Sequence, residues 1–210
     1  MEPQALTTPA APGLLEWGVA ARALDGQPQS GDLHLVKTTE AGALVAVVDA
    51  LGHGADAAVV AQTAISTIER WTGEPLVALL ERCDRALRLT RGAVLSLAGF
   101  DEATKTMTWV GVGNVEGVFL KADPAARPAR ESMLLRGGVV GYRLPSLMSS
   151  VRRVDPGDLL VVATDGIRTD FAEHVVAGAP AKAMADRLLQ RCGKGTDDAL
   201  VLVVRYRGKA

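Results

Sequence analysis

The pattern of apolar and polar positions predicts strands in the first quarter of the chain. Residues 15–23 form the first predicted strand, and a loop rich in glycine, proline and glutamine, residues 25–31, follows it. Residues 33–39 and 43–48 form a predicted hairpin around the turn at 40–42. Every side chain of 43–48 is apolar, which is typical of a central strand that is covered on both faces.

Two amphipathic helices are predicted next, because apolar residues then recur at helical spacing. Their apolar positions are Val60, Ala64, Ile68 and Trp71 in the first helix, and Leu76, Leu79, Leu80, Cys83 and Leu87 in the second. Gly73 separates the two segments, and Pro75 suits the first turn of the second helix.

Strands return in the second half of the chain. Residues 93–100 and 106–112 flank a predicted turn at 101–105, and 115–121 continues this meander. Residues 122–131 contain two prolines and are predicted to form a surface loop. The remaining predicted elements are strands at 149–154 and 158–163 joined by the turn 155–158, a helix at 180–192 and a closing strand at 199–206.

This order of elements predicts an α+β fold. Consecutive strands joined by short turns favour antiparallel sheets over strand–helix–strand crossovers. We therefore expect two stacked antiparallel sheets flanked by helices, in a single domain at residues 14–210. Residues 1–13 are rich in alanine, threonine and proline and lack a basic region before an apolar run, so we expect a flexible tail and no secretion signal.

Composition and charge narrow the function classes. The formal net charge of −1 argues against non-specific nucleic-acid binding, and no apolar stretch reaches the length needed to span a membrane. Cys83 and Cys192 lie far apart and belong to no CxxC pair or histidine–cysteine cluster along the sequence. We expect free thiols in the reducing cytoplasm, and the cysteine pattern predicts no zinc site.

Acidic residues occupy equivalent places at four strand ends. Asp32 opens a strand, Asp49 and Asp165 each close one, and Asp197 and Asp198 precede the last one. Carboxylates that converge on one edge of a sheet repel each other, and Mg²⁺ or Mn²⁺ relieves that repulsion. A single aspartate beside a strand is more often a turn or cap residue, so the inference depends on all four sites occurring together.

Four segments resemble, in order, the successive motifs of the PP2C-type (PPM) metal-dependent protein phosphatases. These segments are Ser30-Gly-Asp32, Asp49-Ala-Leu-Gly-His-Gly54, Thr164-Asp-Gly-Ile167 and Thr196-Asp-Asp-Ala199. The similarity is greatest to the bacterial branch that includes SpoIIE, RsbU and RsbX. Within that branch, Gly111-Val-Gly-Asn-Val115 and Gly137-Gly-Val-Val-Gly141 are similar to segments of the RsbX subgroup. The resemblance spans residues 15–206 and implies a four-layer α/β/β/α sandwich.

The resemblance also implies a site and a reaction. Two Mn²⁺ or Mg²⁺ ions of this family activate water against phosphoserine or phosphothreonine. Matched motif by motif, Asp49 would bridge the two ions, Asp165 and Asp197 would hold the first, and Asp32 and the Ala50 carbonyl would serve the second. Asp49, Asp165 and Asp197 would thus be the catalytic carboxylates, with no cysteine nucleophile.

Four points depart from the family or leave its pattern open. Ala50 stands where the family usually has glycine, and its side chain crowds the site slightly. Asp197 is preferred to Asp198 as the ligand, because the family's ligand comes first in its acidic pair. Larger relatives carry a phosphate-binding arginine near the first strand, which does not align clearly with Arg22. His53 has two open interpretations, a proton carrier or a structural residue.

The RsbX resemblance implies a substrate class. The implied partners are phosphorylated STAS-domain proteins of the stressosome or of sigma-factor regulation. Two alternatives are an RsbU- or SpoIIE-type phosphatase acting on a phosphorylated anti-sigma factor antagonist, and a non-catalytic module that binds phosphoproteins. Carboxylates at all four motifs argue against a non-catalytic binding module.

Residues 121–155 carry a net charge of +4 in a chain that is −1 overall. Arg127 and Arg130 lie in the proline-containing loop and are the predicted substrate-binding residues, because a basic surface attracts an acidic phosphorylated partner. The alternative interpretation is a solvated face with scattered arginines.

Overall fold

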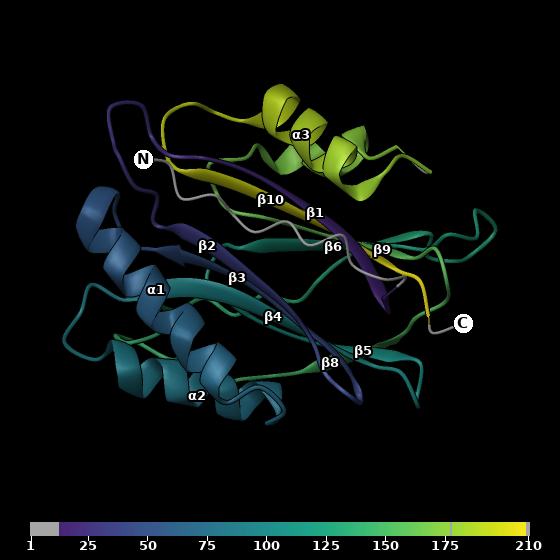
Figure 1. Ribbon diagram of the computed structural model, residues 1–210, viewed down its shortest axis with the longest axis horizontal. Coiled ribbons are helices and arrows are strands. Elements are labelled where there is room, and N and C mark those ends of the chain that lie inside the picture. The colour runs from purple at the N-terminus through teal and green to yellow at the C-terminus, as the bar shows by residue number, and fades with distance from the viewer. Residues whose placement is uncertain (1–12, 177, 209–210) are drawn as a thin grey trace.

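The computed structural model describes residues 13–176 and 178–208, and it contains two five-stranded sheets that stack face to face (Figure 1). The first sheet has the order β1 (Leu15–Arg22), β10 (Ala199–Tyr206), β9 (Leu159–Ala163), β6 (Glu116–Leu120) and β7 (Arg130–Ser132). The second has the order β2 (Asp32–Thr38), β3 (Gly42–Ala50), β4 (Ala93–Asp101), β5 (Thr106–Val112) and β8 (Ser150–Arg153). Every pair of neighbouring strands is antiparallel.

Helices cover the outer face of each sheet (Figure 1). Helices α1 (Gly54–Arg70) and α2 (Leu76–Leu87) pack on the second sheet, and α3 (Ala181–Cys192) packs on the first. The short 3₁₀ helix η1 (Thr169–His174) packs against the same cluster as α3. Among the described residues, no helix has the length and apolar character needed to cross a membrane. The predicted four-layer α/β/β/α sandwich is confirmed.

The core has three layers because the central strands are apolar on both faces. Along β3, Leu44, Ala46 and Val48 pack against α1 and α2. Their neighbours Val45 and Val47 pack between the two sheets. Since side chains alternate along a strand, one fully buried strand contributes to two layers of the core.

Two connections pass from one sheet to the other: the one before 115–121, which the sequence predicts as continuing a meander, and the predicted turn between 149–154 and 158–163. Strand β6 pairs with β9 and not with β5, and β8 pairs with β5 while β9 belongs to the other sheet. The predicted turn at 155–158 is present, but it links the two sheets. Local turn signals do not specify which sheet the next strand joins, because strands of both sheets are covered on both faces.

Smaller differences concern ends of elements. The predicted loop at 122–131 ends in the short strand β7, and η1 follows β9 without having been predicted. Pro75 precedes α2 as its cap residue, and Trp71 lies just beyond the end of α1. The predicted N-terminal tail comprises residues 1–13. All of it except Gly13 lies outside the described residues.

Candidate metal centre

The strand register brings Asp32 and Asp49 together. Asp32 begins β2 and lies directly opposite Asp49, which is the next-to-last residue of β3. Directly opposed residues of an antiparallel pair point to the same face of the sheet. Along β3 that face is the one shared by Val45 and Val47, so both carboxyl groups point toward the first sheet.

The first sheet supplies the other acidic residues at the same end of the sandwich. Asp165 follows β9, and Asp197 and Asp198 precede β10, which pairs with β9. Thr164 joins the two sheets, because its hydroxyl donates to Oδ2 of Asp32 at 2.7 Å and accepts the backbone N–H of Leu200 at 2.9 Å. The aspartates at all four motifs are therefore gathered at one end of the stacked sheets.

Burial and mutual repulsion shift the titration of two of these groups. Loss of solvation, together with the smaller effect of the nearby carboxylates of Asp165, Asp197 and Asp198, raises the pKa of Asp32 to about 7 and that of Asp49 to about 8. Buried, like-charged oxygen donors are the environment that a hard divalent cation stabilises. The residues present therefore fit a divalent metal ion.

We expect the stabilisation of the protein by Mg²⁺ to increase with pH. Between the ordinary carboxyl pKa of 3.8 and the raised values of about 7 and 8, the folded metal-free protein binds more protons than the unfolded chain. The contribution of Asp32 and Asp49 to stability is thus present at low pH and lost as the pH rises through 7 and 8. Metal ions compete with the protons on Asp32 and Asp49. They therefore bind more easily as the pH rises, and they offset the stability that the metal-free protein loses.

Thermal melts with and without millimolar Mg²⁺ at about pH 5.5 and about pH 8 test this expectation. The gain in Tm should be larger at the higher pH. A gain that is the same at both values would show that neither carboxyl group must lose a proton when the ion binds.

The two adjacent aspartates before β10 have different environments. Asp198 is buried, and its two carboxylate oxygens accept the backbone N–H groups of Leu24 at 2.7 Å and Gly31 at 2.6 Å. Asp197 is less buried, and its Oδ1 accepts the N–H of Asp198 at 2.9 Å. Both oxygens of Asp198 are thus already bound to backbone N–H groups, whereas Asp197 lines a pocket with Asp49 and Asp165.

A pocket of about 360 Å³ opens over the carboxylates. Asp49, Asp165 and Asp197 line it, and Asn114 donates its amide N–H to Oδ2 of Asp165 at 2.9 Å. Asp32 and Ala50 are buried and do not line the pocket. Its other walls include four glycines, which leave room above the acids; they are Gly52, Gly113, Gly137 and Gly138.

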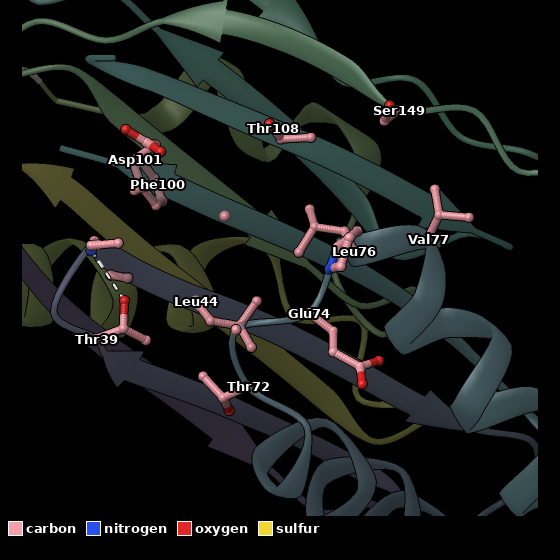
Figure 2. A pocket seen from close by; sticks show the side chains of 16 residues that line it. Thr39, Leu44, Thr72, Glu74, Leu76, Val77, Phe100, Asp101, Thr108 and Ser149 are labelled. Atoms are coloured by element: carbon pink, nitrogen blue, oxygen red, sulfur yellow. Dashed lines mark hydrogen bonds between the residues drawn. The ribbon is translucent and has the colours of Figure 1, made fainter. Parts of the chain in front are cut away.

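A second pocket of about 360 Å³ lies at the opposite end of β3 (Figure 2). Its two acidic residues, Glu74 and Asp101, lie well apart in Figure 2. Glu74 binds the guanidinium of Arg82 at 2.6 and 2.7 Å, and Asp101 accepts the backbone N–H of Thr104 at 2.8 Å. Since its acids are separate and already paired, this pocket lacks the converging donors that a metal centre needs.

The structure does not bring the predicted substrate-binding arginines to the carboxylates. Arg130 pairs with Leu120, at the far end of β6 from Glu116, which lies opposite Ala163, two residues before Asp165. Arg127 donates to the carbonyls of its own loop, at Pro124 and Ala126. Arg127 and Arg130 therefore do not line the pocket over the carboxylates, and their binding of a phosphorylated partner stays a prediction.

Part of the basic stretch is also neutralised by local ion pairs. Lys121 lies 2.6 Å from carboxylate oxygens of both Asp155 and Asp158, and Arg152 pairs with Glu131. These contacts reduce the positive charge that this surface offers to a partner.

The histidines have separate places. His53 is exposed and precedes α1 without capping it through its side chain. His34 packs against Trp17 with ring centroids 5.7 Å apart, and His174 lies 3.6 Å from Asp170. Arg22 lies opposite Ala199 at the end of β1.

Three supporting contacts were missed by the motif comparison. Thr164 and Asn114 orient carboxylates, and the Lys194 ammonium donates to the backbone carbonyl of Asp165 at 2.6 Å. Thr164 and Asn114 both lie inside segments that the sequence already distinguishes. Lys194 carries no comparable signal, because only the folded chain places it beside Asp165.

Comparison with known proteins identifies sequence relatives. The family model of Stage II sporulation protein E (SpoIIE) matches residues 39–207. Phosphoserine phosphatase RsbX of Bacillus subtilis (strain 168) is 24% identical over 178 residues, which make up 83% of this chain and 86% of that protein.

Solved structures share the fold. A chain from work on "The bacterial stressosome: a modular system that has been adapted to control secondary messenger signaling" is 32% identical, with a TM-score of 0.83 over 91% of this chain and 99% of that chain. RsbX in complex with magnesium is 20% identical, with a TM-score of 0.81 over 91% and 94%. The phosphatase domain of SpoIIE from Bacillus subtilis is 21% identical, with a TM-score of 0.77 over 93% and 64%.

Proposed function

The chain belongs to the Stage II sporulation protein E (SpoIIE) family, and on that premise we propose that it is an RsbX-like, metal-dependent protein serine/threonine phosphatase. The observation that carries the proposal is the gathering of Asp32, Asp49, Asp165 and Asp197 at one end of the sandwich, beside an open pocket. A module that only binds phosphoproteins has no need for such a cluster, because buried carboxylates without a cation oppose folding.

The proposed cofactor is a pair of Mg²⁺ or Mn²⁺ ions. The carboxylates of both Asp32 and Asp165 are close enough to Asp49 to raise its pKa, so Asp49 would contact both ions. Asp165 and Asp197 would hold one ion, and Asp32 with the Ala50 carbonyl would serve the other. When bound, such ions supply a nucleophilic water at neutral pH and neutralise phosphoryl oxygens.

The chain's own residues hold these donors in place. Thr164 fixes one oxygen of Asp32, and Asn114 fixes one oxygen of Asp165. Asp198 ties the segments at Leu24 and Gly31 to the start of β10, which fixes the backbone on both sides of the cluster. Supporting hydrogen bonds of this kind orient metal ligands and keep the free site from rearranging.

The proposed substrates are phosphorylated STAS-domain regulatory proteins in the cytoplasm. The similarity to RsbX, which covers most of both chains, supports this class, and both cysteines are free thiols. Release of inorganic phosphate from purified phosphorylated STAS proteins in millimolar Mn²⁺ tests it. A phosphorylated anti-sigma factor antagonist should be processed more slowly if the enzyme is RsbX-like. Faster turnover of that substrate would favour an RsbU-type role.

Replacing both Arg127 and Arg130 with alanine should separate partner docking from chemistry. Since the pair lies away from the pocket, turnover of para-nitrophenyl phosphate should not change. If the pair attracts the phosphoprotein, its kcat/KM should fall roughly 3- to 10-fold and lose part of its salt dependence. The matched control replaces Lys182 and Arg187, two exposed cations on α3. Equal losses with both substrates would show that the loop supports the fold of the site.

A further inference from the structure

A second group of metal-binding side chains lies outside the carboxylate centre. Asp170 and His174 come from η1, and Cys192 is the last residue of α3. One donor atom from each lies within 4.8 Å of the other two. The sequence gives no sign of this group, because the whole of α3 separates the histidine from the cysteine.

We propose that Asp170, His174 and Cys192 bind a Zn²⁺ ion. A thiolate, an imidazole and a carboxylate are the three ligand types that zinc accepts in proteins. Mg²⁺ and Mn²⁺ prefer oxygen donors, so the mixed set distinguishes this site from the carboxylate centre. Three protein ligands leave the fourth tetrahedral position for water.

Local structure brings the three ligands together. Asp170 and His174 are four residues apart in η1, and their side chains lie 3.6 Å from each other. The backbone N–H of Arg168 donates to the carbonyl of Cys192 at 2.9 Å, which ties the start of η1 to the end of α3. An antiparallel bridge between Ile167 and Gly193 fixes the same junction.

A supporting residue holds the carboxylate. The Arg168 guanidinium donates to both oxygens of Asp170, each at 3.1 Å. Carboxylate ligands of metals are commonly held by such outer hydrogen bonds, and one oxygen can bind the ion while the other keeps its donor.

The exposure of Asp170 and His174 would let a metal ion reach the thiol from solvent. Asp170 and His174 are partly exposed, whereas Cys192 is buried behind them. Burial and the Asp170 carboxylate raise the pKa of Cys192, and Arg168 acts in the opposite direction. A bound cation reverses this balance, because a coordinated thiol loses its proton.

The proposed ion would reinforce the segment that leads to Asp165. Gly166 and Ile167 connect Asp165 to η1, and the N–H of Lys194 donates to the carbonyl of Gly166 at 2.8 Å. An ion that links η1 to the end of α3 would therefore stabilise the backbone on one side of the carboxylate centre. The ion would thus act on the backbone beside the carboxylate centre and would not be one of the ions held by that centre.

Titration with Co²⁺ in excess Mg²⁺ tests the zinc site directly. A thiolate bound to Co²⁺ gives a near-ultraviolet charge-transfer band that an all-oxygen centre cannot produce. The wild type and the matched control Cys83→Ser should both show the band, and Zn²⁺ should abolish it by displacement. Cys192→Ser should lack it, and His174→Gln should weaken Co²⁺ binding by roughly 10-fold or more.

Several outcomes would overturn the proposal. No band in the wild type, a band that survives in Cys192→Ser, or unchanged Co²⁺ affinity in His174→Gln would each do so. Because the His174 side chain is partly exposed, the last variant keeps the test valid even if Cys192→Ser fails to fold.

Discussion

Replacing Asp49 with asparagine should lower kcat/KM for para-nitrophenyl phosphate by more than about 100-fold and leave the fold intact. Changes to groups that only support a metal ligand cost roughly 10- to 100-fold, and Asp49 is the proposed ligand shared by both ions. Its carboxylate is surrounded by other carboxylates, so the neutral amide removes repulsion in the metal-free protein.

Melting curves distinguish this chemical effect from unfolding. Metal-free Asp49→Asn should melt at or above the Tm of the metal-free wild type, and it should lose the gain in Tm that Mg²⁺ gives the wild type. Asp186→Asn is the matched control, because Asp186 is an exposed aspartate on α3. A full metal-induced gain in Asp49→Asn would remove Asp49 from the proposed centre.

Asparagine substitutions at Asp197 and Asp198 should have opposite consequences, although the residues are adjacent. Asp197→Asn should lower kcat/KM about 100-fold with little change in the metal-free Tm, because Asp197 faces the pocket. Asp198→Asn should lower stability by about 1–3 kcal/mol, because one of the two backbone N–H groups, that of the partly buried Leu24 or of the buried Gly31, loses its acceptor. For a domain of this size, that is a fall in Tm of about 2–4 °C per kcal/mol.

The same pair of variants can reject the assignment. If Asp197→Asn is the destabilised variant and Asp198→Asn loses activity at an unchanged Tm, then Asp198 is the ligand and Asp197 the structural residue. Steady-state turnover and melting curves on both variants in excess chelator and in millimolar Mn²⁺ give the answer.

The sequence predicts individual elements better than the pairing between them. Apolar runs such as 43–48 identify buried strands because the run is short and bounded by turn residues, whereas a buried helix needs a longer segment. The same property hides the sheet to which a strand belongs. Strands β5 and β6 are both covered on two faces, so nothing in their apolar pattern shows that the chain changes sheet at Gly113 and Asn114.

In the candidate site too, local sequence predicts individual residues better than the contacts between them. Motifs identify the aspartates because each follows or precedes an apolar strand together with a glycine. Contacts across the chain are not visible in this way, as with Thr164 and Asp32, which are 132 residues apart and share a 2.7 Å hydrogen bond. The distance of Arg130 from the pocket likewise depends on the register of β6 with β7, which no local pattern specifies.

Turnover of para-nitrophenyl phosphate by the wild type and Asp49→Asn, first in excess chelator and then after Mn²⁺ or Mg²⁺ is added, tests the proposed metal-dependent phosphatase most directly. The wild type should be inactive in chelator and regain activity with either ion, and Asp49→Asn should stay inactive throughout. Full turnover by the wild type in excess chelator, or by Asp49→Asn in Mn²⁺, would contradict catalysis at this carboxylate centre.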